Sequence, residues 1–415
     1  MVKTKDIRNS FHLFSGLYFD GGAGTPVLRC ALDGLNDYYI RAGGTSPYGT
    51  FGASKEATDL INAARKDISI LVNSDIDSVC LVGSATGDIK NIARYLQNSG
   101  MVKGDDAIIA TALDHESNIH PWKAIAKDNF HLARISEDGG LDMGHLEELL
   151  TKHNPKVVTF PLAANTTGTA PNQEELIKLV RSYREDSIIV GDAVHYAPHD
   201  VMDFKRGFDI LVFSLYKMWN PHGSVAVVEK SLLEKLDTGK MPQISGNPPY
   251  LKMEEGNQCW GSYAAASRMT RWVRDQKPEP SYKELTREQV VKGIGELRDS
   301  EMALFTNLIE GLGKIHGVEI YGIKDGKNGR VPTVAFSLNG KDSQDVVNYL
   351  MEKKGLQLRA GHFYAREAGI HYGLVNVDYR PINGGFIRAS ISPYHREKDV
   401  EKLVNAVESY SRKSQ

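Results

Sequence analysis

Short apolar runs alternate with amphipathic stretches through the first half of the chain. Between the runs, apolar residues recur at helical spacing, as at Ile89, Ile92 and Leu96. The runs have the length and composition of buried strands. They lie at residues 78–82, 107–112, 157–160, 187–190, 210–213 and 223–228. Strands that alternate with helices predict an α/β fold built on a doubly wound, mostly parallel sheet.

The pattern changes in the second half of the chain. From residue 234 to 284 the alternation fails and Pro and Gly cluster, so we interpret this stretch as a boundary region that reaches a partner subunit. The residues after it predict helices at 286–312, 343–354 and 397–411 and strands at 318–321 and 334–338. We therefore expect a large domain at 18–280 and a smaller α+β domain at 281–415, with residues 1–17 packing on the smaller one.

The composition is that of a soluble globular protein. The 415 residues are 41% hydrophobic and 25% charged, with a formal net charge of −2. Without a dense basic cluster, neither nucleic acid nor an anionic membrane surface is an expected partner. No apolar run reaches the roughly 18 residues of a spanning helix and no signal peptide is evident, so we expect a cytoplasmic protein. Cys30, Cys80 and Cys259 lack the spacing of a disulfide framework or a zinc cluster.

An acid and a lysine follow two of the strand candidates. Asp192 follows the run at 187–190, and Lys217 follows the run at 210–213. Ligand sites of open α/β sheets lie beyond the carboxyl ends of the strands, so both side chains can face one crevice. Pyridoxal phosphate needs a lysine for a Schiff base and a carboxylate that keeps its pyridine nitrogen protonated. The alternative is that Asp192 caps a turn and Lys217 is solvated, but a lysine is a poor choice directly after a buried run.

Two glycine-bearing turns are candidates for ligand contact. The turn at 83–87 places Ser84 and Thr86 at a helix N-terminus, where backbone amides and hydroxyls can hold a phosphate. Ordinary N-capping by either residue explains the sequence equally well. The turn at 21–24, which includes Ala23, either approaches a ligand closely or is simply a turn.

Three further polar residues are associated with strand candidates. His115 either lies flat on a pyridine ring or bonds to Asp114 or Glu116. Asn165 either donates to a ligand oxygen or orders its turn. Arg388, within a strand-like alternation, either pairs with a buried acid or clamps a substrate carboxylate.

Taken in order, these motifs resemble the class V aminotransferase family of fold type I pyridoxal-phosphate enzymes, in its cysteine-desulfurase-like branch. The resemblance extends from about Tyr18 to the last helix. It implies a mostly parallel, seven-stranded central sheet sandwiched by helices, and a homodimer with shared active sites that acts on a small amino acid. It makes Lys217 the Schiff-base lysine and Asp192 the partner of the pyridine nitrogen. It also places His115 on the ring, Asn165 at the ring hydroxyl, Ser84, Ala85, Thr86 and Ser214 at the phosphate, Asn257 at the partner's phosphate, and Arg388, Arg359, His362 and Ala23 at the substrate.

Three positions depart from the family's pattern. Most relatives carry glutamine where this chain has His195 and histidine where it has Tyr216, and both changes keep a hydrogen-bonding group near the cofactor. Tyr364 follows the stretch RAGHF, in the loop where desulfurases place the cysteine that forms a persulfide. Because a persulfide requires a thiolate, a phenol at this position disfavours desulfurase chemistry.

The resemblance to this family, together with the absence of the persulfide-forming cysteine, predicts a lyase that acts on a small amino acid through a quinonoid carbanion. β-Elimination fits, and so does decarboxylation with formation of a carbon–carbon bond. Tyr364, Arg359 and His362 are the candidates for deciding between them. A cysteine desulfurase, an aminotransferase or an epimerase of the same family is the alternative.

Two other classes of protein stay open. A metal hydrolase could use Asp192, His195, His199 and His222, although these histidines lie in Pro-bearing loops and not at HExxH spacing on a helix. A non-catalytic scaffold would keep the fold and lose the chemistry. The joint presence of Lys217, Asp192, His115 and Arg388 argues against the scaffold.

Overall fold

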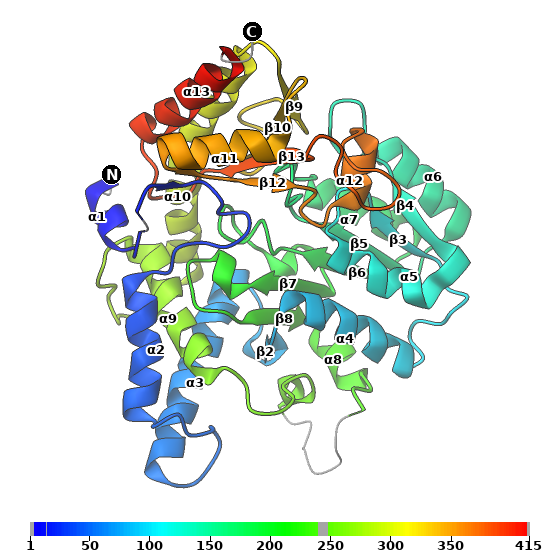
Figure 1. Ribbon diagram of the computed structural model, residues 1–415. Helices are drawn as coiled ribbons and strands as arrows, with labels where there is room; N and C mark the ends of the chain where they lie inside the picture. Colours follow the sequence, from blue (N-terminus) through cyan, green and yellow to red (C-terminus); the bar gives the residue numbers. More distant parts are fainter. Residues whose placement is uncertain (1–3, 14, 240–247, 413–415) are drawn as a thin grey trace.

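The computed structural model describes residues 4–13, 15–239 and 248–412, and within them a seven-stranded sheet forms the centre of the molecule (Figure 1). Its strands are β2 (Val79–Val82), β3 (Ile108–Thr111), β4 (Phe130–Ala133), β5 (Val157–Pro161), β6 (Ile188–Asp192), β7 (Ile210–Ser214) and β8 (Ser224–Val228). Their order is β2-β8-β7-β6-β5-β3-β4. Strand β8 is antiparallel to both neighbours, and the other neighbouring pairs are parallel. The predicted mostly parallel α/β sheet is confirmed.

Helices cover both faces of this sheet because its inner strands are apolar on both sides. In β7, Leu211 and Phe213 pack in one hydrophobic cluster and Ile210 and Val212 in another. The first cluster includes residues of α2 (Arg29–Arg41), α3 (Gly52–Val72), α6 (Met143–His153), α7 (Gln173–Tyr183) and α9 (Trp260–Asp275). The second includes residues of α4 (Ala85–Asn98), α5 (His120–Ala126) and α8 (Lys230–Lys235). None of the helices within the described ranges is long and apolar enough to cross a membrane.

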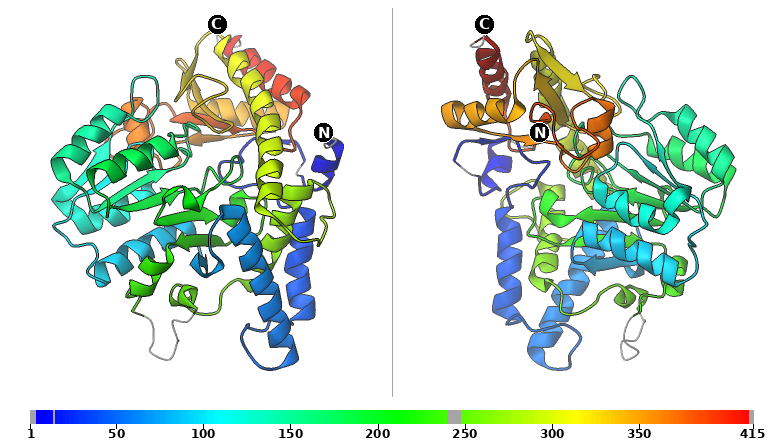
Figure 2. Two further views of the ribbon diagram at one scale, coloured as in Figure 1. Left: turned by 180° about the vertical axis from the view of Figure 1, so that it is seen from behind. Right: turned by 45° about the vertical axis from the view of Figure 1, so that its right-hand side comes forward.

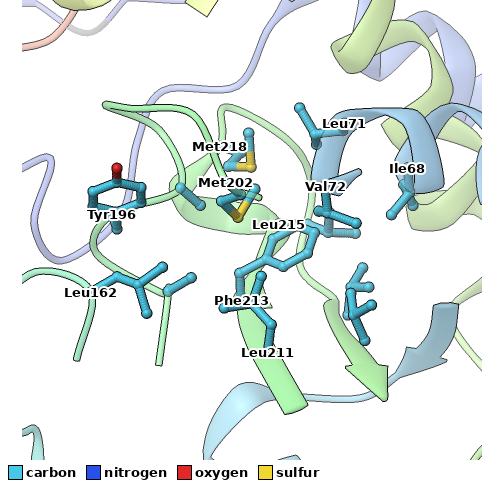
Figure 3. Packing of buried hydrophobic residues seen from close by; sticks show 14 of the residues in the cluster. Ile68, Leu71, Val72, Leu162, Tyr196, Met202, Leu211, Phe213, Leu215 and Met218 are labelled. Atoms are coloured by element: carbon cyan, nitrogen blue, oxygen red, sulfur yellow. The ribbon is translucent and has the colours of Figure 1, made fainter. Parts of the chain in front are cut away.

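The core directly behind the lysine loop is closely packed. Figure 3 shows Leu211 and Phe213 of β7 and Leu215 of the following turn on one side. Ile68 and Leu71 of α3 approach them from the other side. All five side chains are fully buried. This packing fixes the strand end from which the lysine loop starts.

Within residues 248–412, the C-terminal part of the chain contains a four-stranded antiparallel sheet (Figure 2). Its order is β12 (Arg359–Gly361), β13 (Phe386–Ser390), β10 (Thr333–Leu338) and β9 (Val318–Tyr321). The helices of this part are α10 (Arg287–Gly313), α11 (Ser343–Lys354), α12 (Arg366–His371) and α13 (Glu397–Arg412). Helix α10 begins with a capping box between Thr286 and Gln289. The predicted helices and strands of this part are therefore present.

The N-terminal segment packs on the C-terminal part. It contains α1 (Thr4–Asn9) and β1 (Leu17–Tyr18), and β1 pairs in parallel with β11 (Leu356–Gln357). Arg8 forms an ion pair with Asp399 of α13 at 3.4 Å. The turn at 21–24 follows β1 directly, so this pairing carries it to the sheet that bears Arg388.

The interpretation of residues 234–284 as an irregular connection is wrong for its second half. Helix α9 occupies residues 260–275, and residues 240–247 lie outside the described residues. The helix is buried on most of its surface, but many of its buried residues are small, such as Gly261, Ser262 and Ala264, and these give little apolar signal in the sequence. It packs closely on α2, where a Cβ on Gly34 would lie 2.9 Å from the Cα of Ala265. Strand β4 was also missed, because it is short and mostly half-buried.

Candidate active site

An inner cavity of about 150 Å³ lies beyond the carboxyl ends of β5, β6 and β7. Asp192 is the last residue of β6, and Lys217 ends the short 3-10 turn that follows β7. Because β6 and β7 are parallel neighbours, both side chains reach this cavity. The structure thus brings together the acid and the lysine that the sequence analysis paired.

Lys217 lies in a desolvated environment. Burial lowers the pKa of its ammonium group to about 7, and Arg388 acts in the same direction, while Asp192 and Asp20 oppose the shift. A large fraction of Lys217 is therefore the neutral amine at neutral pH, the form that attacks an aldehyde or accepts a proton. Burial also raises the pKa of Asp192, opposed by the Val194 N–H, which donates to Asp192 Oδ1 at 2.9 Å.

His115 lines the inner cavity as a neutral ring. Its Nδ1 accepts from the Ser117 backbone N–H at 3.1 Å, which leaves the ring proton on Nε2. Burial lowers its pKa to about 4, and nearby positive charges act in the same direction. Asp114 and Glu116 bond to other side chains, so the alternative of a histidine bonded to a neighbouring carboxylate is wrong.

Two buried polar atoms at this cavity have no hydrogen-bond partner among the described residues. They are Asn165 Oδ1 and His195 Nδ1. Asn165 Nδ2 donates to the Phe363 carbonyl at 2.8 Å, so this amide holds two loops together and still presents its oxygen. His195 Nε2 lies 3.0 Å from Thr333 Oγ1. Because buried polar atoms are nearly always satisfied, both atoms indicate a ligand with polar groups.

Helix α4 begins at the inner cavity. Ser84 is its N-cap and accepts from the Gly87 N–H at 3.3 Å, so the capping alternative is correct for Ser84. Ser84, Ala85 and Thr86 also line the cavity, together with Ser214. The free amides and the partial positive charge of a helix N-terminus favour an anion here.

An outer cavity of about 510 Å³ adjoins the inner one. The two share His115, Asn165, Tyr216 and Lys217 among their lining residues. The expected substrate-side residues all lie in the outer wall, namely Ala23, Arg359, His362, Tyr364 and Arg388. A molecule held at Lys217 therefore faces this wall.

Asp20 holds both arginines of the outer wall. Its Oδ1 lies 3.2 Å from Arg388 Nη2, and its Oδ2 lies 2.9 Å from Arg359 Nε. Arg388 also donates to the Asn165 carbonyl at 3.0 Å. The alternative that Arg388 pairs with a buried acid is therefore correct, and the pair fixes the guanidinium in the wall of the cavity.

The Arg388 guanidinium lies between an aromatic ring and a glycine. Its Cζ is 4.1 Å from the centroid of the Phe363 ring, a cation–π contact. On the Gly22 side, an added Cβ would lie 2.7 Å from the same Cζ. A side chain at position 22 would therefore displace the guanidinium.

Gly22→Ala is expected to raise the substrate KM about tenfold, because overpacking a close contact costs about 1–3 kcal/mol. The cofactor content should not change, since Gly22 does not line the inner cavity. Gly24→Ala is the matched control, because its Cβ would lie at an ordinary 3.4 Å from the Tyr216 ring. Steady-state kinetics and absorbance measure both quantities. An unchanged KM in Gly22→Ala would contradict the positioning of Arg388.

Tyr364 lies at the mouth of the outer cavity with 66% of its surface exposed. Phe363 and Tyr364 have φ angles of 53° and 56°, a left-handed conformation that costs non-glycine residues of order 1–3 kcal/mol each. The Tyr364 N–H donates to His362 Nδ1 at 3.0 Å, and its carbonyl accepts from the Glu116 N–H at 2.8 Å. These bonds hold the strained turn and keep the phenol ring 5.5 Å from the ring of His115.

Asn257 lines neither cavity of its own chain. It is exposed, and its Oδ1 accepts from Ser46 Oγ at 2.9 Å and from Trp260 Nε1 at 2.7 Å. Its expected contribution to a partner's phosphate site stays a prediction, as does the homodimer.

The metal-hydrolase alternative is wrong. Within the described part of the chain, no group of three or more His, Cys, Asp or Glu side chains is arranged to hold a metal ion. His199 Nδ1 lies 2.9 Å from Glu301 Oε2, and His222 is exposed and stacks on a tyrosine. The His199 ring lies 5.9 Å from the His195 ring, but neither His199 nor His222 lines the inner cavity with Asp192.

Sequence reasoning missed four residues of this site. Asp20 and Gly22 hold the substrate-side arginine, Ser117 sets the tautomer of the cavity histidine, and Phe363 stacks on the arginine. An acid directly before the glycine turn was a usable signal for Asp20. The contact of Phe363 depends on a positive φ that residue type does not reveal.

The fold and the buried lysine and aspartate define a cofactor-dependent α/β enzyme. The sequence model of the family described as "Aminotransferase class-V" matches residues 17–258 and 290–403. The chain therefore belongs to the class V aminotransferase family, whose members depend on pyridoxal phosphate.

Individual relatives agree with this assignment. "Probable cysteine desulfurase 2" of Mycobacterium leprae is 25% identical over 410 residues, which cover 94% of this chain and 90% of the relative. "Aminotransferase-like protein FGM3" of Gibberella zeae is 27% identical over 405 residues, 94% of each chain. An apo structure of cysteine desulfurase from Thermococcus onnurineus matches with a TM-score of 0.85 at 22% identity, covering 100% of this chain and 99% of the other. This structural likeness supports the fold type.

Proposed function

We propose that the chain is a pyridoxal-phosphate-dependent lyase that acts on a small amino acid. The observation that carries the proposal is the inner cavity, where a buried lysine, a buried aspartate and a helix N-terminus converge. These are the amine, the counter-ion and the anion site that the cofactor requires. Membership of the class V family supports the same cofactor.

The cavity residues fit the cofactor in their chemistry. Lys217 would hold its aldehyde, and Asp192 would pair with its pyridine nitrogen. The unpartnered Asn165 Oδ1 would accept from the ring hydroxyl. The neutral ring of His115 would cover the cofactor ring. The phosphate would lie at Ser84, Ala85, Thr86 and Ser214, with His195 and Tyr216 beside the ring or the phosphate.

The chain's own residues supply the base and the electrostatics. When bound, the cofactor withdraws electron density from the substrate Cα as a bond to that carbon breaks. Lys217, whose pKa burial lowers to about 7, would accept the proton at Cα as a neutral amine and return it as the ammonium ion. Asp192 would supply the negative charge that pairs with a protonated pyridine nitrogen, and such a positive partner would favour the ionised carboxylate despite burial. Arg388 and Arg359 hold the substrate carboxylate.

Tyr364 supports lyase chemistry over sulfur transfer. A phenol does not form a persulfide, but it can donate a hydrogen bond to a leaving group or to an incoming acceptor. Its ring lies 5.5 Å from the ring of His115, which lines both the inner and the outer cavity. Elimination of a β-substituent and loss of a β-carboxylate both suit this arrangement.

The reaction class is tested by supplying the holoenzyme with L-cysteine, L-cystine, L-aspartate and L-alanine. A lyase should release sulfide and pyruvate from a sulfur amino acid, or carbon dioxide from aspartate. These products are measured by sulfide, lactate dehydrogenase and carbon dioxide assays. A keto acid formed only with stoichiometric loss of the bound aldehyde would indicate an aminotransferase and would contradict the lyase.

A cysteine desulfurase is the second candidate, because several curated relatives bear that name. Of the cysteines, Cys30 and Cys80 are buried and Cys259 is exposed. A desulfurase would place a persulfide on Cys259 after treatment with L-cysteine, and Cys259→Ala would abolish it. The lyase predicts no protein-bound persulfide in either protein, which mass spectrometry of the intact chain decides.

A further inference from the structure

A third cavity, of about 770 Å³, lies between the beginning of α7, helix α10 and the loop before β10. It shares no lining residue with the inner or outer cavity. Its volume falls within the roughly 300–1,000 Å³ of small-molecule sites. The proposed reaction makes no use of it.

Basic side chains dominate the wall of this cavity. The lining contains two acidic residues, Asp200 and Asp299, and Arg298 forms an ion pair with each of them at 3.1 Å. Arg206, Lys327 and Arg330 also line the cavity, and among the described residues none of them forms an ion pair within 4 Å. The wall therefore carries an excess of positive charge, which attracts an anion.

Arg330 is the buried member of this set, with 7% of its surface exposed. It donates to the Ile323, Thr167 and Thr333 carbonyls, the last two at 2.9 and 2.7 Å, and lies over the Phe305 ring, while its Nε has no partner among the described residues. Burial lowers its pKa to about 10, and the exposed Asp325 opposes this only in part. A buried cation without an adjacent carboxylate costs free energy, which an anion in the cavity would reduce.

Arg206 is an exposed residue whose guanidinium is held by one hydrogen bond. Its Nη1 donates to Gln173 Oε1 at 2.7 Å, at the first residue of α7. Arg206 ends a 3-10 turn after β6, whereas Lys327 and Arg330 come from the loop before β10. Both terminal nitrogens of Arg330 donate to backbone carbonyls, so this arginine contributes its charge and its unpartnered Nε. Arg206 and Lys327 supply the exposed donors, and together the three cations suit a doubly charged anion.

We propose that this cavity binds a small dianionic metabolite, a phosphate ester or a dicarboxylate, through Arg206, Lys327 and Arg330. The site is linked to the cofactor cavity by two hydrogen bonds. Arg330 donates to the Thr333 carbonyl at 2.7 Å, and the Thr333 hydroxyl lies 3.0 Å from His195 Nε2. A bound anion thus acts on the residue that holds His195 in the inner cavity.

Calorimetric titration of the holoenzyme with glycerol 2-phosphate and with succinate, at constant ionic strength, tests the site and separates the two kinds of anion. Saturable binding of one of them is expected. The double variant Arg206→Gln/Lys327→Gln should weaken it about tenfold or more, the effect of losing charge-assisted hydrogen bonds. The matched control is Lys205→Gln/Lys324→Gln, two exposed residues that do not line the cavity, and it should bind as the wild type does.

Three results would overturn the proposal. They are the absence of saturable binding of either probe, equal weakening in the control variant, and loss of binding in Arg388→Gln, which would place the anion in the outer cavity instead. The link to His195 has its own readout, the pH midpoint of the cofactor absorption band. The probe should shift that midpoint in the wild type and not in the double variant, and an unshifted midpoint at saturation would refute the link.

Discussion

Lys217→Ala is expected to lose the covalently held cofactor and nearly all turnover. The variant lacks the amine that would bind the aldehyde and act as the base at Cα, and loss of a general base alone costs about 10²- to 10⁴-fold in rate. The absorption band of the bound cofactor should therefore disappear after dialysis. No other lysine lines the inner cavity, as far as the described residues define it, so none can take its place there.

Lys205→Ala serves as the control for this variant, because Lys205 is an exposed lysine that lines none of the three cavities described above. It should keep both the absorption band and the activity. A dialysed Lys217→Ala protein that still carries a borohydride-reducible band would contradict the assignment.

Asp192→Asn is expected to keep the cofactor and to lose about 10²- to 10³-fold in kcat, or about 3–4 kcal/mol of transition-state stabilisation. The amide retains the size of the side chain and its place at the end of β6, but it removes the negative charge that would keep the pyridine nitrogen protonated. Rapid kinetics with absorbance detection should show normal substrate binding and slow loss of the Cα proton.

Asp88→Asn is the matched control for the charge at Asp192. Asp88 is also a buried acid, it accepts from the Ser224 hydroxyl, and it lines neither the inner nor the outer cavity. Burial raises its pKa to about 7, so an amide resembles the protonated form that it adopts readily. A loss of activity as large in Asp88→Asn as in Asp192→Asn would assign the effect to packing and not to the cofactor.

The central sheet could be predicted from the sequence because its strands are buried on both faces. Runs such as 188–192 and 210–214 are apolar without interruption, and each ends at a polar residue. Helix α9 could not be predicted in the same way. It packs against α2, α3 and α10 largely through small residues such as Ala264, Ala265 and Ala266, which give a weak apolar pattern in the sequence.

The paired lysine and aspartate were predictable because strand ends of a parallel sheet share one edge. The wall of the outer cavity was harder to predict, because it joins segments that lie far apart in the chain. Asp20 follows the first strand, while the arginines that it holds lie in β12 and β13. Only the pairing of β12 with β13, and of β1 with β11 beside them, brings these charges together.

The covalent attachment of the cofactor is tested most directly by reduction of the purified wild-type protein with borohydride, followed by proteolysis and mass spectrometry. We expect one peptide with the mass of a reduced pyridoxyl phosphate group, and fragmentation should place that group on Lys217. A modified peptide that contains a different lysine, or the absence of any modified peptide from a protein that shows the cofactor band, would contradict this expectation.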